Sequence, residues 1–158
     1  MLKRLSATGV RGLTCGLVSL VLLGSLTVVE AKSQIEKNKK IAVAFLTMIF
    51  NEHKVAEAFK LYSVPDYKQH NPYAATGAQA AIDFFVPYLQ KNPQASTEIK
   101  RVIAEGDLVA IHNNPKQNPR DRGRAVVDIF RLKDGKVVEH WDVVQDVPEK
   151  ALNTNTMF

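Results

Sequence analysis

Residues 125–145, AVVDIFRLKDGKVVEHWDVVQ, decide the fold class of this chain. Apolar and polar side chains alternate on both sides of Asp134-Gly135, and this period of two is that of a half-buried β-strand. The Asp-Gly pair is typical of a two-residue hairpin turn, because both of its positions need a positive φ. We therefore expect an antiparallel hairpin made of strands 125–132 and 136–145.

The sequence before this hairpin predicts three helices followed by two more strands. The helices are expected where apolar residues recur every three or four positions, and the first begins at a capping box from Ser33 to Glu36. The expected elements are helices over 33–50, 53–62 and 78–90 and strands over 97–104 and 108–113. Helices first and antiparallel strands second indicate an α+β fold, with three N-terminal helices packed on one face of a curved, mainly antiparallel sheet.

Length and composition limit the classes of protein that this chain can be. Its 158 residues suffice for one domain with a sizeable core and are too few for a multidomain enzyme. Apolar residues at 46% and charged residues at 23% are typical of a globular protein. Cys15 is the single cysteine, which excludes an internal disulfide and a cysteine-based zinc site.

The N-terminus reads as a secretory signal. Lys3, Arg4 and Arg11 precede an uncharged run over 13–29, and Val29-Glu30-Ala31 matches a signal-peptidase site. We expect cleavage after Ala31 and a periplasmic or secreted protein without a stable membrane span. An uncleaved anchor is the alternative.

This division predicts a signal peptide over 1–31, a single domain over 32–152 and a flexible tail over 153–158. The mature chain keeps 18 basic and 15 acidic residues, a net charge of +3. So small and scattered a charge argues against nucleic acid as a partner, because clustered cations are needed to neutralise phosphates.

Strand alternation sorts the polar residues of the sheet by face. Asp128 shares its side with large apolar residues, where a carboxylate is costly unless it is paired or protonated. His112 likewise shares a side with Leu108 and Ala110. Trp141 is the largest apolar side chain, so we expect its side to face the core and His140 with Asp142 to face outward.

No metal site is expected from the spacing of the ligand-type residues. The chain has four histidines but no His-x-His, His-x-x-x-His or Glu-x-x-His pattern. Alternation also separates Asp128 and His112 from His140 and Asp142. A metal site is therefore not predicted.

Four stretches together carry a resemblance to a known family. They are DYKQHNP at 66–72, IAEGDLVAIH at 103–112, VDIFR at 127–131 and DGKVVEHWDVVQ at 134–145. The chain resembles the SnoaL-like polyketide cyclases over nearly all of 39–149. The resemblance implies the cone-shaped α+β barrel of the nuclear transport factor 2-like superfamily and an aldol closure by acid–base chemistry without metal or cofactor.

The resemblance also bears on the site residues. The family's general base is an Asp four residues after a Trp-like position, and here Gln145 occupies that position, so this mechanism does not transfer. Asp128, His70 and His112 are then the expected catalytic groups, since an acid in an apolar pocket and a His near neutrality suit proton transfer. The residues expected to bind substrate are Trp141, Gln145, Phe130, Phe45 and Tyr62.

Two functions from different classes fit these residues. The first is a small cofactor-free lyase or isomerase acting on a carbonyl compound, and the second is a non-catalytic module that binds a small apolar ligand or serves as a scaffold. A homodimer is expected through the sheet face bearing Val138, His140 and Val144. Should Asp128 and His112 point to solvent while His140 and Asp142 point to the interior, the face assignment is reversed and His140 and Asp142 become the acid–base pair.

Overall fold

The computed structural model describes residues 16–158, and side chains from Val29 onward. The basic start of the expected signal, together with Cys15, lies outside the described residues. The chain divides into two compact units, the first ending at Ser33 and the second spanning residues 34–158. None of the helices within residues 16–158 is both long enough and apolar enough to cross a membrane.

The first helix, α1, spans Gly16–Phe50. The predicted start at Ser33 is therefore wrong for this chain, because the helix continues through the capping box. The residues before Ser33 contain no proline, and extending an existing helix requires no new nucleus, so a local cap signal does not interrupt it. From Ala42 on, the expected apolar stripe is buried.

The larger unit combines three helical segments with five strands, and its order matches the predicted one except for one additional strand between the second and third helices. The further elements are α2 (Val55–Tyr62), β1 (Ser63–Gln69), α3 (Ala78–Lys91), β2 (Ser96–Glu105), β3 (Leu108–Lys116), β4 (Arg124–Lys133) and β5 (Lys136–Asp146). Strand β1 was not expected from the sequence. It contains Pro65, which an edge strand tolerates because its outward N–H groups have no partner strand.

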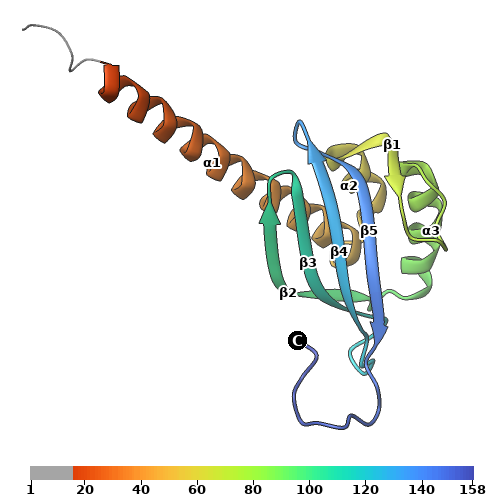
Figure 1. Ribbon diagram of the computed structural model, residues 1–158. Helices are drawn as coiled ribbons and strands as arrows, with labels where there is room; N and C mark the ends of the chain where they lie inside the picture. The colour runs from red at the N-terminus through yellow and green to blue at the C-terminus, as the bar shows by residue number, and fades with distance from the viewer. Residues whose placement is uncertain (1–15) are drawn as a thin grey trace, which may run out of the picture. The chain divides into compact units, whose positions relative to one another are not determined.

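The strands form one open sheet in the order β1-β5-β4-β3-β2. Strand β1 runs parallel to β5, and the other three pairs are antiparallel. The helical layer covers one face of this curved sheet, which we call the inner face (Figure 1). The predicted α+β class with a mainly antiparallel sheet is confirmed.

The predicted hairpin is also confirmed. Strands β4 and β5 are joined through Asp134 and Gly135, whose φ angles of 50° and 75° are both positive. The ladder then contains one irregularity: Leu132 pairs with Val137, but Arg131 pairs with Glu139. Val138 is thus an extra residue, a β-bulge, and side chains beyond it change face relative to a regular strand.

Aromatic side chains link the helices to the inner face. The ring of Phe45 lies edge-on to Phe59 at 4.9 Å and to Phe130 at 5.8 Å. Phe45 is 2% exposed and Phe130 is 3% exposed, so both are core residues. This contact holds α1, α2 and β4 together.

Truncation of Phe45 tests this core. Phe45→Ala is expected to lower the free energy of unfolding by about 3–5 kcal/mol, because it removes buried apolar area and leaves a cavity. The matched control is Val143→Ala, since Val143 is 66% exposed, and its effect should stay within about 0.5 kcal/mol. Urea denaturation of both variants measures the difference, and equal midpoints would contradict the assignment.

Candidate acid–base site

Three ionisable side chains meet on the inner face of the β4–β5 hairpin. Asp128 and Asp142 are cross-strand partners, and His140 pairs with Phe130 two rungs away on the same face. One ligand-type atom from each of Asp128, His140 and Asp142 lies within 4.8 Å of the other two. We call these three residues the acid–base cluster.

His140 is held by hydrogen bonds at both ring nitrogens. Nε2 lies 3.0 Å from Asp128 Oδ1, and Nδ1 lies 3.0 Å from Gln69 Oε1. The ring also stacks on Phe130, with centroids 4.9 Å apart. This three-sided support fixes the orientation of the imidazole.

The neighbouring amide defines where the protons of His140 lie. Gln69 Oε1 also accepts from the Asn71 backbone N–H at 2.9 Å, and Gln69 Nε2 donates to Tyr67 Oη at 2.8 Å. A carbonyl oxygen only accepts, so His140 Nδ1 must carry a proton. The second ring nitrogen, Nε2, faces Asp128 Oδ1.

Asp128 is buried at 8% exposure but fully hydrogen-bonded. Its Oδ2 accepts from Asn113 Nδ2 at 2.6 Å, and Asn113 Oδ1 in turn accepts from Thr97 Oγ1 at 2.8 Å. Asn113 and Thr97 are themselves buried. This relay from β2 through β3 compensates the cost of placing a carboxyl group among apolar side chains.

Asp142 has a different environment from Asp128. Both of its oxygens accept from Asn71 Nδ2, at 2.9 and 2.7 Å. Among the described residues, no cationic side chain lies within ion-pair distance of Asp142, whereas Asp128 pairs with His140. The two carboxyl groups therefore differ in their partners: Asp142 bonds only an amide, whereas Asp128 bonds an amide and an imidazole.

Tyr67 completes the inner-face group from strand β1. It is 3% exposed, and burial raises the pKa of its hydroxyl to about 12, with smaller contributions from Asp142 and Asp128. The phenol therefore stays neutral at physiological pH. It accepts from Gln69 and keeps its own proton to donate.

Expected and observed positions differ for two of the predicted catalytic residues. Asp128 lies on the apolar inner face, as expected. His70 lies on the outer face, where it bonds Glu139 Oε1 at 2.8 Å and stacks on Trp141 at 4.6 Å. His112 also faces outward, accepting from Arg101 at 2.8 Å.

The environment of His112 keeps it neutral. Burial, followed by the nearby charges of Arg101 and Lys100, lowers the pKa of its imidazole. Its ring stacks on Phe158 at 5.5 Å, a contact of the C-terminal residue with the sheet that the sequence did not indicate. The alternation on β3 in fact buries Val109, Ile111 and Asn113, so the face that we assigned to His112 is wrong.

The predicted inward side of β5 is wrong beyond the bulge. Trp141 packs against His70 and Arg131 on the outer face, and Gln145 is exposed. An unbroken hairpin would place Trp141 opposite Asp128, but the extra residue Val138 brings Asp142 to that position. The same shift turns both His140 and Val144 inward, so neither of them belongs to an outer interface with Val138. A homodimer stays a prediction.

The predicted substrate-binding residues do not form one group. Phe45 and Phe130 belong to the packed core, while Tyr62 is half-buried against it. Trp141 and Gln145 lie on the other face of the sheet. Sequence reasoning assigned no role to Tyr67, Gln69 or Asn71, although all three lie in the DYKQHNP stretch that carried part of the resemblance.

The acid–base cluster also brings together three side chains of the kinds that bind metal ions, which the sequence analysis had assigned to opposite faces of the sheet. The expectation that alternation keeps Asp128 apart from His140 and Asp142 is wrong, again because of the bulge. Their donor atoms, however, already take part in hydrogen bonds with one another and with two Asn side chains. Each of these ligand-type atoms is therefore already a hydrogen-bonding partner within the protein.

Comparison with known proteins places the chain in a family. The model of the SnoaL-like domain matches residues 42–140, and the chain belongs to this family. No curated protein matches the sequence.

Solved structures with the same fold include three that represent the range of relatives. A SnoaL-like protein from Burkholderia thailandensis has a TM-score of 0.59 at 16% identity, covering 70% of this chain and 95% of its own. A candidate ketosteroid isomerase from Kribbella flavida has a TM-score of 0.60 at 19% identity, covering 75% of this chain and 85% of its own. A candidate polyketide cyclase from Acidithiobacillus ferrooxidans has a TM-score of 0.56 at 17% identity, covering 68% of this chain and 87% of its own. At these identities, the similarity establishes the nuclear transport factor 2-like fold.

The raised pKa of Tyr67 predicts a loss of stability at alkaline pH. Folding favours the neutral phenol, so its contribution is complete below the ordinary pKa of 10.0 and disappears as pH rises towards 12. Denaturant unfolding at pH 9 and pH 11 should show a smaller loss for Tyr67→Phe than for the unchanged chain. The exposed Tyr73, replaced by Phe, is the control and should leave the loss unchanged.

Proposed function

We propose that this protein is a small acid–base enzyme, a lyase or isomerase, that removes a proton next to a carbonyl group. The convergence of Asp128, His140 and Asp142 on the inner face carries this proposal. Clusters of ionisable groups with distinct environments are typical of catalytic sites. The descriptions of structural neighbours as isomerase and cyclase candidates support the same reaction class.

The contacts favour Asp142 as the general base. Asp128 is less suited, because it is buried and its oxygens are held by two different side chains, Asn113 and His140. Asp142 bonds only a neutral amide, so its carboxylate can take a proton from a carbon acid by releasing Asn71. General base catalysis of this kind contributes typically about 10²–10⁴-fold.

Gln69 supports a carbonyl compound as substrate. Its amide oxygen accepts from His140 Nδ1 and from the Asn71 N–H, which is the environment that stabilises an enolate oxygen. In our proposal the carbonyl oxygen of the substrate displaces Gln69 Oε1 and takes both hydrogen bonds. The neutral hydroxyl of Tyr67, released from Gln69 in this step, is a third donor.

The proton balance of the reaction follows from these roles. Asp142 takes the proton from the carbon next to the carbonyl group, and the electron pair moves to the carbonyl oxygen. Return of the proton to another carbon gives an isomer. Attack of the enolate carbon on a second carbonyl group gives an aldol product, and the reverse reaction cleaves one.

Deuterium exchange tests the proposal without knowledge of the natural substrate. We expect the protein to catalyse exchange of the α-protons of small ketones in D₂O, followed by proton NMR. Asp142→Asn should slow this exchange by about 10²-fold or more, and Asp128→Asn should slow it as well. The matched control is Glu139→Gln, since Glu139 lies next to His140 in sequence but on the outer face.

Two outcomes would contradict the proposal. Unchanged exchange in Asp142→Asn, with circular dichroism like that of the unchanged chain, would remove Asp142 as the base. Absence of exchange for every ketone would favour the second function, a binding module. That alternative is supported by Gln145 at the position of the family's base and by the occupied ring nitrogens of His140.

We further propose that the protein is exported and acts in the periplasm or outside the cell. The basic start, the apolar run and the Val-Glu-Ala end support this location. Cleavage after Ala31 would leave Ser33 close to the new N-terminus, where its side chain can cap the shortened helix. The intact mass of the mature protein should correspond to Lys32–Phe158, and a cytoplasmic protein beginning at Met1 would contradict the proposal.

A further inference from the structure

The inner face of the hairpin continues beyond the acid–base cluster as a regular ladder. Every second rung belongs to this face: beyond Asp128 and Asp142 these rungs join Val126 to Val144 and then Arg124 to Asp146. No bulge interrupts these rungs, so Arg124 is on the same face as Asp128. The two are four residue steps apart along the strand, which is roughly 13 Å.

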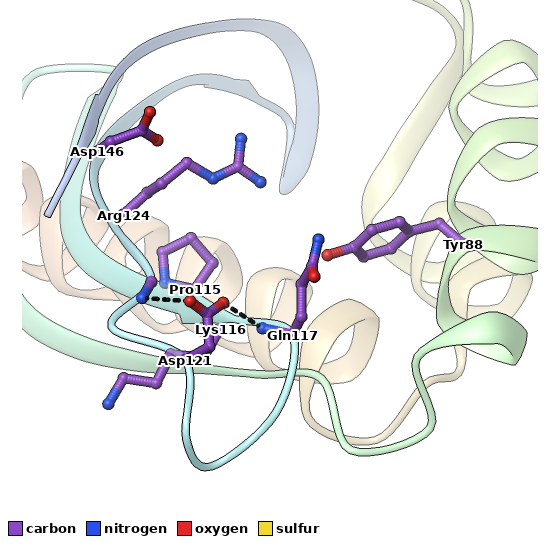
Figure 2. Close-up of a pocket in the computed structure, with 8 residues that line it drawn as sticks. Tyr88, Pro115, Lys116, Gln117, Asp121, Arg124 and Asp146 are labelled. Atoms are coloured by element: carbon purple, nitrogen blue, oxygen red, sulfur yellow. Dashed lines mark hydrogen bonds between the residues drawn. The ribbon is translucent and has the colours of Figure 1, made fainter.

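A cavity of about 360 Å³ lies at the far end of this ladder. Its size falls within the range of small-ligand pockets. The residues that line it are Tyr88, Pro115, Lys116, Gln117, Asp121, Gly123, Arg124 and Asp146. Figure 2 shows the guanidinium of Arg124 extending into the open space, with Tyr88 and Gln117 on the other side.

The cations of this cavity remain available to a ligand. Asp121 is engaged by the backbone N–H groups of Gln117 and Gly123, both at 2.9 Å, and these bonds lower its pKa. Among the described residues, neither Arg124 nor Lys116 lies within 4.0 Å of a carboxylate. Asp146, opposite Arg124 on the ladder, is the carboxylate that competes with a bound anion.

An apolar surface connects the cavity with the cluster. Val144 belongs to the rung between them and is 44% exposed, although its side chain is on the inner face. A ligand that reaches from Asp142 to Arg124 must therefore be apolar in its middle and polar at both ends. A guanidinium recognises a carboxylate with two parallel hydrogen bonds, which makes it the specific group for an acidic end.

We infer that the substrate is a keto acid whose carboxylate binds Arg124 while its carbonyl group lies at the acid–base cluster. This inference rests on the proposed function for the carbonyl end alone. The aliphatic chain covers Val144, and Lys116 adds positive charge beside the carboxylate. Tyr88 and Gln117 supply further hydrogen-bonding groups on the opposite wall.

Equilibrium binding tests the acidic end separately from catalysis. The probes are straight-chain keto acids from oxohexanoate to oxododecanoate and their methyl esters, titrated into the Asp142→Asn variant and followed by calorimetry. We expect one chain length to bind best, and its acid to bind roughly tenfold to a hundredfold more tightly than its ester. Arg124→Gln should abolish this preference, and Asp146→Asn should increase it because it removes the competing carboxylate.

The binding experiment has a matched control, and some of its outcomes would contradict the inference. Lys133→Gln removes an exposed cation at the opposite end of β4 and should leave the preference unchanged. Equal binding of acids and esters, or an unchanged preference in Arg124→Gln, would overturn the acidic subsite. If neutral ketones still exchange deuterium in that case, the proposed function stands. Preferential binding of acids without exchange of any ketone would instead contradict the proposed function and leave the subsite intact.

Discussion

The contact between Asp128 and His140 is the interaction on which the rest of the site depends. It places an ionisable pair next to the aromatic core, where Phe130 stacks on the imidazole and Phe45 packs against Phe130. A carboxyl group in such surroundings is tolerated only when every polar atom has a partner. Asn113 and Thr97 from β3 and β2, together with Gln69 from β1, supply those partners. Thus β1 to β4 all contribute to holding one imidazole on β5.

The bulge at Val138 makes this contact geometrically achievable. The two strands of the hairpin begin in register at the turn, with Leu132 and Val137 both buried. One extra residue then moves His140 and Asp142 to the inner face and Trp141 to the outer face. The sheet therefore carries two polar groups, one on each side. On the outer side, Glu139 bonds both His70 and Arg131, and these two contacts lower the pKa of its carboxyl group.

The family relationship and the site chemistry make different contributions to the functional argument. Membership of the SnoaL-like family establishes the architecture, and this architecture supports more than one activity. The proposal of carbon-acid chemistry instead depends on local details: two carboxyl groups in unlike environments, two N–H donors around one carbonyl oxygen, and a neutral buried phenol. Gln145 lies on the exposed part of β5. Asp142, three residues earlier, supplies a carboxylate on the inner face.

The sequence by itself determined the α+β class, the Asp134-Gly135 hairpin and the apolar face on which Asp128 lies, because each depends on local periodicity or on the φ preference of a turn. Only the tertiary structure decided which residues join Asp128. The bulge at Val138 leaves no glycine or proline as a signal, so alternation counted along β5 assigned Trp141 to the wrong face. Likewise, β1 runs parallel to β5, and it brings Gln69 beside His140 across 71 positions of chain. Such a pairing is a property of the assembled sheet, since no local pattern records which distant strand lies at its edge.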